Sequence, residues 1–480
     1  MHIGHSNADA SRLGEVLRCA RRVHFIGIGG IGISALAELL LLKGIKVSGS
    51  DVSSSEITKR LASLGAEIRV PGSAEELARS GADLAVYSLS IRADDPEYLE
   101  CGRLGIPTVS RAELLGVLMK DYEYRIGISG SHGKSTVTAM LTAILSKAGL
   151  APTVVAGAPF SSGSSLIVGE KRYFVYEACE YFDSFLHFNP THAVILNVDL
   201  DHTDYFPDLS VLLRSFVLAA DRAERLAVIC TDGESALDVA ERVSVPKLTL
   251  GERGDIRYRI SEREDGFSAV FADGREIITG APGRHNAENA AVAAAVASEL
   301  GVPWDVIAAA LGEFSGIKRR LERIATLKGV PVIYDYAHHP KEIHAAIDTL
   351  EKMRYNKIAV VFRPHTYTRT AAFFDELAAA LARCRYAYIA EIYAAREEPI
   401  PFVDAEALAR RVTELGGSAR AIETDISIEQ LPSDMDCLVL MGAGDLTKIK
   451  KRITEYEKSC DTDNNASDGG SRRVSDRGSG

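Results

Sequence analysis

Short apolar stretches of strand length alternate with a longer apolar stretch of helix length near the start of the chain. Residues 23–26 have the pattern of a buried strand, residues 31–42 that of an apolar helix, and residues 47–50 that of a second strand. A strand, a helix and a strand in this order predict a βαβ unit, whose strands lie parallel in one sheet. The alternation continues through residues 84–89 and ends near Lys120.

The same alternation starts again twice along the chain. In the middle region it predicts strands at residues 124–129, 174–177 and 193–198, and helices at residues 135–147, 286–300 and 305–314. In the last region it predicts strands at residues 332–336, 358–362, 386–392 and 438–441, and helices at residues 340–353 and 371–382. Strands separated by helices are typical of parallel sheets covered by helices.

These three regions predict three domains in series. A chain of 480 residues is too long for one hydrophobic core. We place the domains at residues 1–123, 124–317 and 318–457, and expect residues 458–480 to be a disordered tail because they lack apolar periodicity. The predicted fold class is therefore α/β, with a mostly parallel sheet and flanking helices in each domain.

Composition and charge narrow the classes of function. Sixty-six acidic residues against 55 basic ones give a net charge of −11, which does not favour a nucleic-acid or membrane partner. The seven cysteines are widely spread and form no CxxC pair, so they predict neither a disulfide framework nor a cysteine-rich zinc cluster. The first residues also lack the pattern of a secretion signal. We therefore expect a cytoplasmic protein.

A glycine-rich motif follows the first predicted strand and opens the first predicted helix. Its residues are Gly27, Ile28, Gly29, Gly30, Ile31 and Gly32, and an acidic residue, Asp51, follows about twenty positions later. Glycines allow close approach of the backbone to a diphosphate, and the helix N-terminus supplies N–H donors. The motif predicts a bound nucleotide diphosphate in a Rossmann-like domain, although NAD, another nucleotide or a purely structural turn would each fit it.

A second motif resembles a phosphate-binding loop. It consists of Gly130, Ser131, His132, Gly133, Lys134, Ser135 and Thr136, again between a strand and a helix. In such loops the backbone amides and the lysine contact phosphates, and the hydroxyl after the lysine holds Mg²⁺. Ile128 stands where the usual pattern has its first glycine. The motif predicts a P-loop-type central ATPase domain; an ordinary helix start with a surface lysine is the alternative.

Candidate metal ligands end two strands of the middle region. Glu177 lies in the sequence EACE and His202 in the sequence NVDLDH. Both strand ends should lie at the carboxyl edge of the sheet, where open α/β sheets bind ligands. A surface or capping histidine would explain His202 equally well, whereas a carboxylate on an apolar strand needs a partner.

Polar residues also gather at two strand ends of the last region, which predicts a further Rossmann-like domain. The sequence DYAHHP begins at Asp335 and the sequence RPHTYTR begins at Arg363. Histidine, arginine and tyrosine at one sheet edge suit recognition of an anion or a zwitterion. Helix capping and loop packing account for such residues as readily.

Taken together, these motifs resemble the Mur ligase family of ATP-dependent amide-bond-forming enzymes, over roughly residues 20–457. The shared motifs are HFIGIGGIGISALA and SGSD in the first domain; GSHGKST, EACEY, NVDLDHTDYF, GRHNAENAAVAAAVA and GIKRRLE in the second; and DYAHHPKEI, FRPHTYTRT and MGAGD in the third.

The resemblance implies a role for each site residue. ATP would be held by residues 130–136 together with Asn286, Asn289, Arg320 and Asp335. Two Mg²⁺ ions would be held, one by Ser135 and one by Glu177 with His202, while the loop at residues 27–32 and Asp51 would bind a UDP-linked substrate. The acceptor amino acid would face Tyr336, His338 and Arg369. The catalytic residues would be Lys134, Glu177, His202, Arg320 and His338, with His338 a candidate base for the incoming amine.

The resemblance is greatest to the alanine-adding branch of the family. That branch joins L-alanine to the lactyl carboxylate of UDP-N-acetylmuramate through an acyl phosphate. Two features bear on the branch: Thr366 replaces a residue that is often basic, and residues 215–218 lack the lysine that sister ligases carbamylate. The alternatives are a sister ligase that adds a preformed peptide, an NAD-dependent oxidoreductase and a catalytically silent nucleotide-binding scaffold. We expect a monomer or a weak homodimer.

Overall fold

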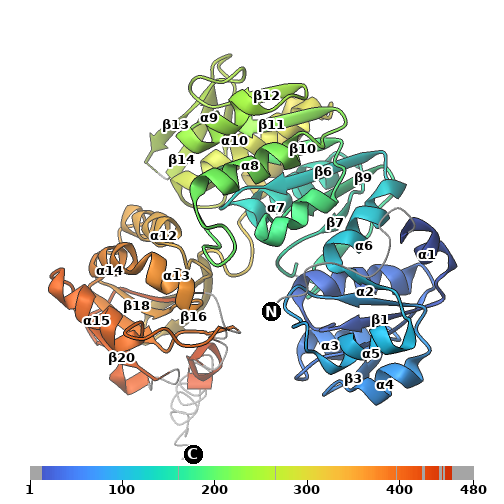
Figure 1. Cartoon of the computed structure of the whole chain (residues 1–480). Coiled ribbons are helices and arrows are strands. Elements are labelled where there is room, and N and C mark those ends of the chain that lie inside the picture. The colour runs from blue at the N-terminus through green and yellow to red at the C-terminus, as the bar shows by residue number, and fades with distance from the viewer. Residues whose placement is uncertain are drawn as a thin grey trace, which may run out of the picture. The chain divides into compact units, whose positions relative to one another are not determined.

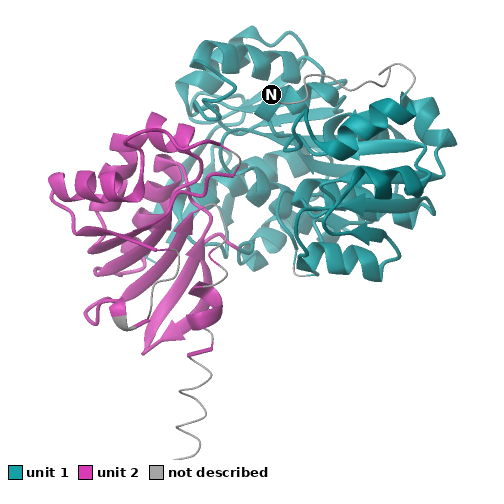
Figure 2. Ribbon diagram, turned by 60° about the horizontal axis from the view of Figure 1, so that its bottom comes forward, with its two compact units in different colours: residues 1–318 teal, residues 319–480 magenta. Residues whose placement is uncertain are grey.

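The structure is a computed structural model that describes most of the chain. It describes residues 13–160, 162–264, 266–395, 397–423, 428–442, 446, 449–453 and 455–456. The first twelve residues, most of the MGAGD motif and the predicted tail lie outside the described residues. The chain divides into two compact units, residues 1–318 and 319–480 (Figure 2).

The first sheet of unit 1 is wholly parallel and confirms the predicted βαβ unit. Its strand order is β3-β2-β1-β4-β5. The strands are β1 (Arg22–Ile26), β2 (Lys46–Ser50), β3 (Glu67–Arg69), β4 (Leu84–Tyr87) and β5 (Thr108–Ser110). The helices are α1 (Leu13–Cys19), α2 (Ile31–Leu42), α3 (Glu56–Ser63), α4 (Ala74–Ser80), α5 (Pro96–Leu104) and α6 (Arg111–Leu118), with the 3₁₀ turn η1 (Met119–Asp121). Helix α1 precedes the first predicted strand and buries Leu13 and Leu17.

The second sheet of unit 1 has the order β12-β11-β10-β6-β9-β7-β8 and is parallel except for β8. Its strands are β6 (Tyr124–Ser129), β7 (Thr153–Val155), β8 (Leu166–Ile167), β9 (Tyr173–Glu177), β10 (His192–Ile195), β11 (Leu226–Cys230) and β12 (Lys247–Leu250). The helical segments are α7 (Lys134–Lys147), η2 (Tyr181–His187), α8 (Leu209–Ala220), α9 (Glu234–Arg242), α10 (Arg284–Glu299) and α11 (Trp304–Glu313). Helix α10 buries a run of alanines and valines over residues 290–297 and packs on α7 (Figure 1).

A separate antiparallel sheet in unit 1 was not predicted. It consists of β13 (Tyr258–Arg263), β14 (Gly266–Phe271) and β15 (Glu276–Ile278).

The two parallel sheets of this unit are also joined by a buried carboxylate. Glu38 on α2 accepts two hydrogen bonds from Arg60, at 2.9 and 2.7 Å, and one from the Ser164 hydroxyl at 2.7 Å. Helix α2 is thereby tied to the segment between β7 and β8.

Unit 2 contains one sheet with the order β16-β17-β21-β18-β19-β20, parallel except for β16. Its strands are β16 (Glu322–Leu327), β17 (Val330–Asp335), β18 (Ile358–Arg363), β19 (Tyr386–Ala390), β20 (Ala419–Ile422) and β21 (Cys437–Gly442). Its helical segments are α12 (Pro340–Lys352), α13 (Tyr367–Ala372), α14 (Phe374–Ala382), α15 (Ala405–Glu414) and η3 (Ile428–Gln430). The prediction of one helix over residues 371–382 was wrong, because the chain leaves helical geometry at Phe373.

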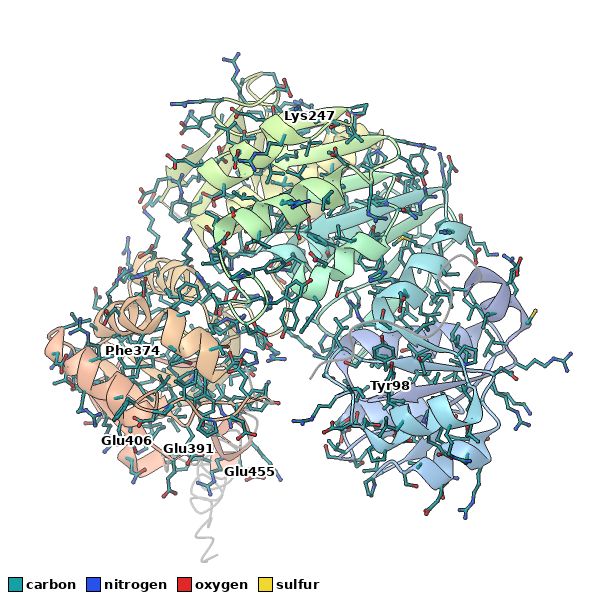
Figure 3. All side chains as sticks on the ribbon, viewed as in Figure 1. Tyr98, Lys247, Phe374, Glu391, Glu406 and Glu455 are labelled. Carbon is teal, nitrogen blue, oxygen red and sulfur yellow. The ribbon has the colours of Figure 1, made fainter. Side chains whose placement is uncertain are left out.

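Aromatic contacts add to the apolar packing on the sheets. Tyr98 lies on α5 (Figure 3). Its ring meets that of Tyr87 on β4 edge to face, with ring centroids 5.4 Å apart. Among the described residues, no helix combines the length and the apolar character that crossing a membrane requires.

A buried histidine gives unit 1 a testable pH dependence. Burial, helped by Arg225, lowers the pKa of His192 to about 4, from about 6.5 in an unfolded chain. The folded state then binds fewer protons than the unfolded state, so stability is lost as the pH falls from about 6.5 towards 4. When the pH is lowered from 7.5 to 5, we expect the melting temperature to fall less in His192→Gln than in the wild type.

Thermal unfolding at the two pH values measures this difference. The control is His344→Gln, which should behave like the wild type. His344 bonds Arg383 among exposed side chains. An equal loss in the wild type and His192→Gln would contradict the assignment.

Candidate active site

The glycine-rich loop connects β1 to α2 and is fixed by the end of β2. Gly27, at a φ of 78°, and Ile28 both donate to the Ser50 carbonyl at 2.9 Å, and Gly29 donates to the Asp51 carboxylate at 2.8 Å. A Cβ on Gly29 would come within 2.7 Å of that carboxylate. The predicted motif and its acidic residue thus come together, and Asp51 orders the loop.

An arginine that the sequence motifs did not indicate lies against this loop. A Cβ on Gly32 would come within 3.3 Å of Arg111 Nη1, which places the guanidinium over the start of α2. Burial lowers the pKa of Arg111, and nearby Cys179 and Glu177 act in the opposite direction. Arg111 therefore places a positive charge near both the glycine-rich loop and the end of β9.

The phosphate-loop motif connects β6 to α7 and is held by the segment after β10. The Ser131 amide donates to the Asn197 carbonyl at 3.2 Å, and the His132 amide donates to Asn197 Oδ1 at 2.8 Å. The Asn197 side chain returns a bond to the His132 carbonyl at 3.1 Å. Gly130 and Gly133 have φ values of 135° and 87°, which only glycine adopts without strain. The loop is therefore rigid, and Asn197 was missed as a site residue.

Lys134 sits at the centre of this loop in a polar cage. Its ammonium donates to the Gly130 and Ser131 carbonyls and to both oxygens of Glu180, at 3.1 and 3.2 Å. Burial works to lower the pKa of Lys134, but the adjacent Glu180 carboxylate outweighs it and the pKa is raised overall. Lys134 is therefore a permanent cation. Glu180 belongs to the EACE motif, but the sequence alone indicated no role for it.

Glu177, at the end of β9, meets the phosphate-loop helix. Ser135 donates its hydroxyl to Glu177 Oε2 at 3.0 Å, and the Gly157 amide donates to the other carboxylate oxygen. A carboxylate beside a hydroxyl offers the hard oxygen donors that Mg²⁺ prefers. The residues present at this position therefore fit the predicted ion.

His202 lies after β10, in the left-handed region with a φ of 51°. Its ring stacks on Tyr181 with centroids 4.3 Å apart, and its Nε2 lies 3.7 Å from Glu180 Oε1. Burial raises the pKa of the neighbouring Cys179 thiol to about 11. The structure thus gives His202 the neighbours Cys179 and Glu180, while its metal-binding role with Glu177 stays a prediction.

The two predicted asparagines both lie on α10. A Cβ on Gly133 would come within 2.6 Å of Asn289 Oδ1, so Asn289 borders the loop directly. Asn286 is buried, donates to the Pro282 carbonyl at 2.6 Å and accepts a bond from Asn289 at 3.4 Å. Asn289 therefore borders the loop and Asn286 is bonded to Asn289, while the contact of both with ATP stays a prediction.

In unit 2, Asp335 and Arg320 lie at the carboxyl end of β17. Asp335 is buried and accepts bonds from the amides of Leu321 and Ala337, each at 2.7 Å. Burial raises the pKa of Asp335, and the positive charge of Arg320 opposes this effect. Arg320 also donates to Glu342 at 3.2 Å. Arg320 thus pairs with Glu342 close to Asp335, and the contact of Arg320 and Asp335 with ATP stays a prediction.

His365 links three predicted residues, Tyr336, His338 and Arg369, by ring contacts and a hydrogen bond. The His338 ring lies 5.2 Å from Tyr336 and 5.7 Å from His365, and Arg369 donates to His365 Nδ1 at 2.7 Å. His338 Nδ1 bonds the Tyr336 carbonyl at 2.9 Å, so Nε2 is the acceptor nitrogen of the neutral ring. Thr366 caps α13, accepting the Arg369 amide at 3.4 Å.

Three family models match successive parts of the chain. The model described as "Mur ligase family, catalytic domain" matches residues 22–123, "Mur ligase middle domain" matches residues 128–297, and "Mur ligase, glutamate ligase domain" matches residues 319–444. The chain belongs to the Mur ligase family. The predicted family and the α/β fold class are thus confirmed.

Individual Mur ligases match this chain over most of its length. A UDP-N-acetylmuramate–L-alanine ligase of Caldanaerobacter subterraneus is 38% identical and covers 91% of this chain and 98% of its own. One from Lachnospira eligens is 39% identical over 89% of this chain and 96% of its own. The solved UDP-N-acetylmuramate–alanine ligase of Thermotoga maritima is 26% identical, with a TM-score of 0.78 over 92% of this chain and 99% of its own.

A murein peptide ligase from Psychrobacter arcticus shares the fold, with a TM-score of 0.70 at 22% identity over 91% of this chain and 98% of its own.

Proposed function

We propose that this Mur ligase joins L-alanine to the lactyl carboxylate of UDP-N-acetylmuramate, with ATP converted to ADP and phosphate. The observation that carries the proposal is the near full-length similarity to alanine-adding relatives, at 38% identity over 98% of one of them. The arrangement around Lys134 supports the same chemistry. We further propose that the enzyme works in the cytoplasm as a monomer or a weak homodimer.

The chemical difficulty is that a carboxylate must approach the γ-phosphate, which is itself negatively charged. The reaction then gives an acyl phosphate and ADP, and the amine of alanine displaces the phosphate at the acyl carbon. Lys134 would supply positive charge, and the loop amides that are not bonded to Asn197 would supply N–H donors, where the transferred phosphoryl group develops charge. In this proposal Arg111 orients the carboxylate of the donor, because it lies between the glycine-rich loop and Glu177.

Ser135 would hold one Mg²⁺ ion, and Glu177 with His202 would hold a second; the Ser135 hydroxyl lies 3.0 Å from Glu177 Oε2. Bound Mg²⁺ would neutralise phosphate charge and make the γ-phosphorus more open to attack by the carboxylate. In this proposal Glu177 acts by positioning the Mg²⁺ ion. Its two carboxylate oxygens are themselves fixed by Ser135 and Gly157.

The acceptor site in the proposal is built from unit 2. Arg369 is buried and would pair with the carboxylate of alanine, while His338 Nε2 would accept the proton of the incoming ammonium. His365 holds Arg369 in place through the 2.7 Å bond.

Arg369→Ala is expected to raise the KM for L-alanine by about ten- to a hundredfold, since a charge-assisted bond contributes about 1.5–3 kcal/mol. The KM for ATP should change much less. Initial rates at varied alanine measure the effect. Arg383→Ala, which removes ion pairs to Asp348 and Glu351 in the same unit, is the control. An unchanged alanine KM in Arg369→Ala would remove Arg369 from the acceptor site.

The test of the proposed function is phosphate release from MgATP with UDP-N-acetylmuramate and one of four acceptors. These are L-alanine, glycine, L-serine and the tripeptide L-Ala-D-Glu-meso-diaminopimelate, with mass detection of each product. Release that depends on alanine, with the matching mass gain, is expected. Release with the tripeptide alone would indicate the peptide-adding branch, and no release with any acceptor would contradict the ligase proposal.

A further inference from the structure

Three side chains of different chemistry converge beside the phosphate-binding loop of unit 1. Potential ligand atoms of Cys179, Glu180 and His202 all lie within 4.8 Å of one another. Glu180 is only 1% exposed, so one acid of this group is buried. Cys179 has no role in the proposed reaction, and Glu180 enters it only by holding Lys134.

The fold fixes this group in place. Cys179 and Glu180 directly follow β9, and His202 follows β10, while β6 lies between these strands in the sheet. The His202 ring stacks on Tyr181 with planes 25° apart, and the Tyr181 hydroxyl donates to Asp204 at 2.5 Å. The imidazole therefore has one orientation, with Nε2 towards Glu180 at 3.7 Å.

A thiol, an imidazole and a carboxylate form a donor set that differs from the hard oxygen set of Mg²⁺. Sulfur and nitrogen ligands select zinc and similar ions, and three protein ligands leave one position of a tetrahedral site open. Bonds of about 2.0–2.3 Å from one ion require the ligand atoms to approach only modestly from their present spacing.

We propose that Cys179, Glu180 and His202 form a binding site for a thiophilic divalent cation such as Zn²⁺. The metal–sulfur bond forms as the thiol proton leaves to the buffer. Glu180 also holds Lys134 at 3.1 Å, so a bound dication competes with this lysine for the same carboxylate. Occupancy by Zn²⁺ therefore disturbs the phosphate-binding loop, and micromolar Zn²⁺ is expected to inhibit a reaction supported by Mg²⁺.

The direct test titrates the reduced full-length protein with Co²⁺ alone, without nucleotide, and therefore does not depend on the proposed function. We expect a thiolate-to-cobalt absorption band in the near ultraviolet that saturates at one equivalent. Equimolar Zn²⁺ should remove the band, whereas a hundredfold excess of Mg²⁺ should leave it. Absence of the band, or its removal by Mg²⁺, would overturn the proposal.

Variants assign the band to these residues. Cys179→Ser should abolish it and His202→Gln should weaken Co²⁺ binding at least tenfold, while Cys19→Ser, at an exposed thiol on α1, should keep it. A band that persists in Cys179→Ser would overturn the proposal. In the wild-type protein, Zn²⁺ should also slow alkylation of the Cys179 peptide, read by mass spectrometry; equal protection by Mg²⁺, or none by Zn²⁺, would count against it.

Discussion

Lys134→Ala is expected to lower kcat by about a thousandfold, equivalent to about 4 kcal/mol of lost transition-state stabilisation. The ammonium of Lys134 is the buried cation at the centre of the phosphate-binding loop, held by Glu180 at 3.1 Å and by the loop carbonyls. Its removal takes away charge that the transferred phosphoryl group needs and leaves Glu180 as an extra negative charge. Phosphate release under saturating substrates measures the effect.

The matched control is Lys147→Ala at the other end of the same helix, α7. Lys147 pairs with Glu313 at 2.8 Å on the surface, so its loss should change kcat less than twofold. Circular dichroism should show that both variants fold. Turnover in Lys134→Ala within tenfold of the wild type would remove this loop from the catalytic site.

Glu177→Gln is expected to lower kcat/KM about a hundredfold and to raise the Mg²⁺ concentration needed for half-maximal rate. The substitution keeps the side-chain size but removes the charge that faces the Ser135 hydroxyl at 3.0 Å. An amide is a weaker Mg²⁺ ligand than a carboxylate, and only one of its two terminal atoms is an acceptor. Initial rates over a Mg²⁺ series separate the two effects.

Glu313→Gln provides the control, since Glu313 is a surface acid that ends α11 and pairs with Lys147. Its Mg²⁺ dependence should match that of the wild type. If Glu177→Gln responded to Mg²⁺ as the wild type does, Glu177 would not be a metal ligand.

The parallel sheets were predictable because their strands are short apolar runs next to glycine-rich turns. The strand at Tyr124–Ser129 and the helix at Ile31–Leu42 have the predicted bounds. The antiparallel sheet at residues 258–278 was missed because its strands are half exposed and carry polar residues such as Arg259 and Glu262. The helix break at Phe373 was missed because no glycine or proline marks it.

The residues of the candidate site were also predictable only in part. Lys134 and Gly130 were identified because they belong to one short motif. The spacing of glycine and lysine in that motif is typical of a phosphate-binding loop. Glu180 and Arg111 were missed because their roles come from partners far away in the sequence. Glu180 meets Lys134 across 46 residues, and Arg111 meets a loop on a different strand. Such contacts depend on strand order, which local spacing does not encode.

The most direct test of the proposed ligase follows one oxygen atom. UDP-N-acetylmuramate labelled with ¹⁸O at both lactyl carboxylate oxygens is incubated with MgATP, L-alanine and the full-length protein. If the carboxylate attacks the γ-phosphate and the amine then displaces phosphate, each phosphate released carries one ¹⁸O and each amide product keeps one. Phosphate without ¹⁸O, formed alongside a product that retains both labelled oxygens or alongside no product, would contradict the account.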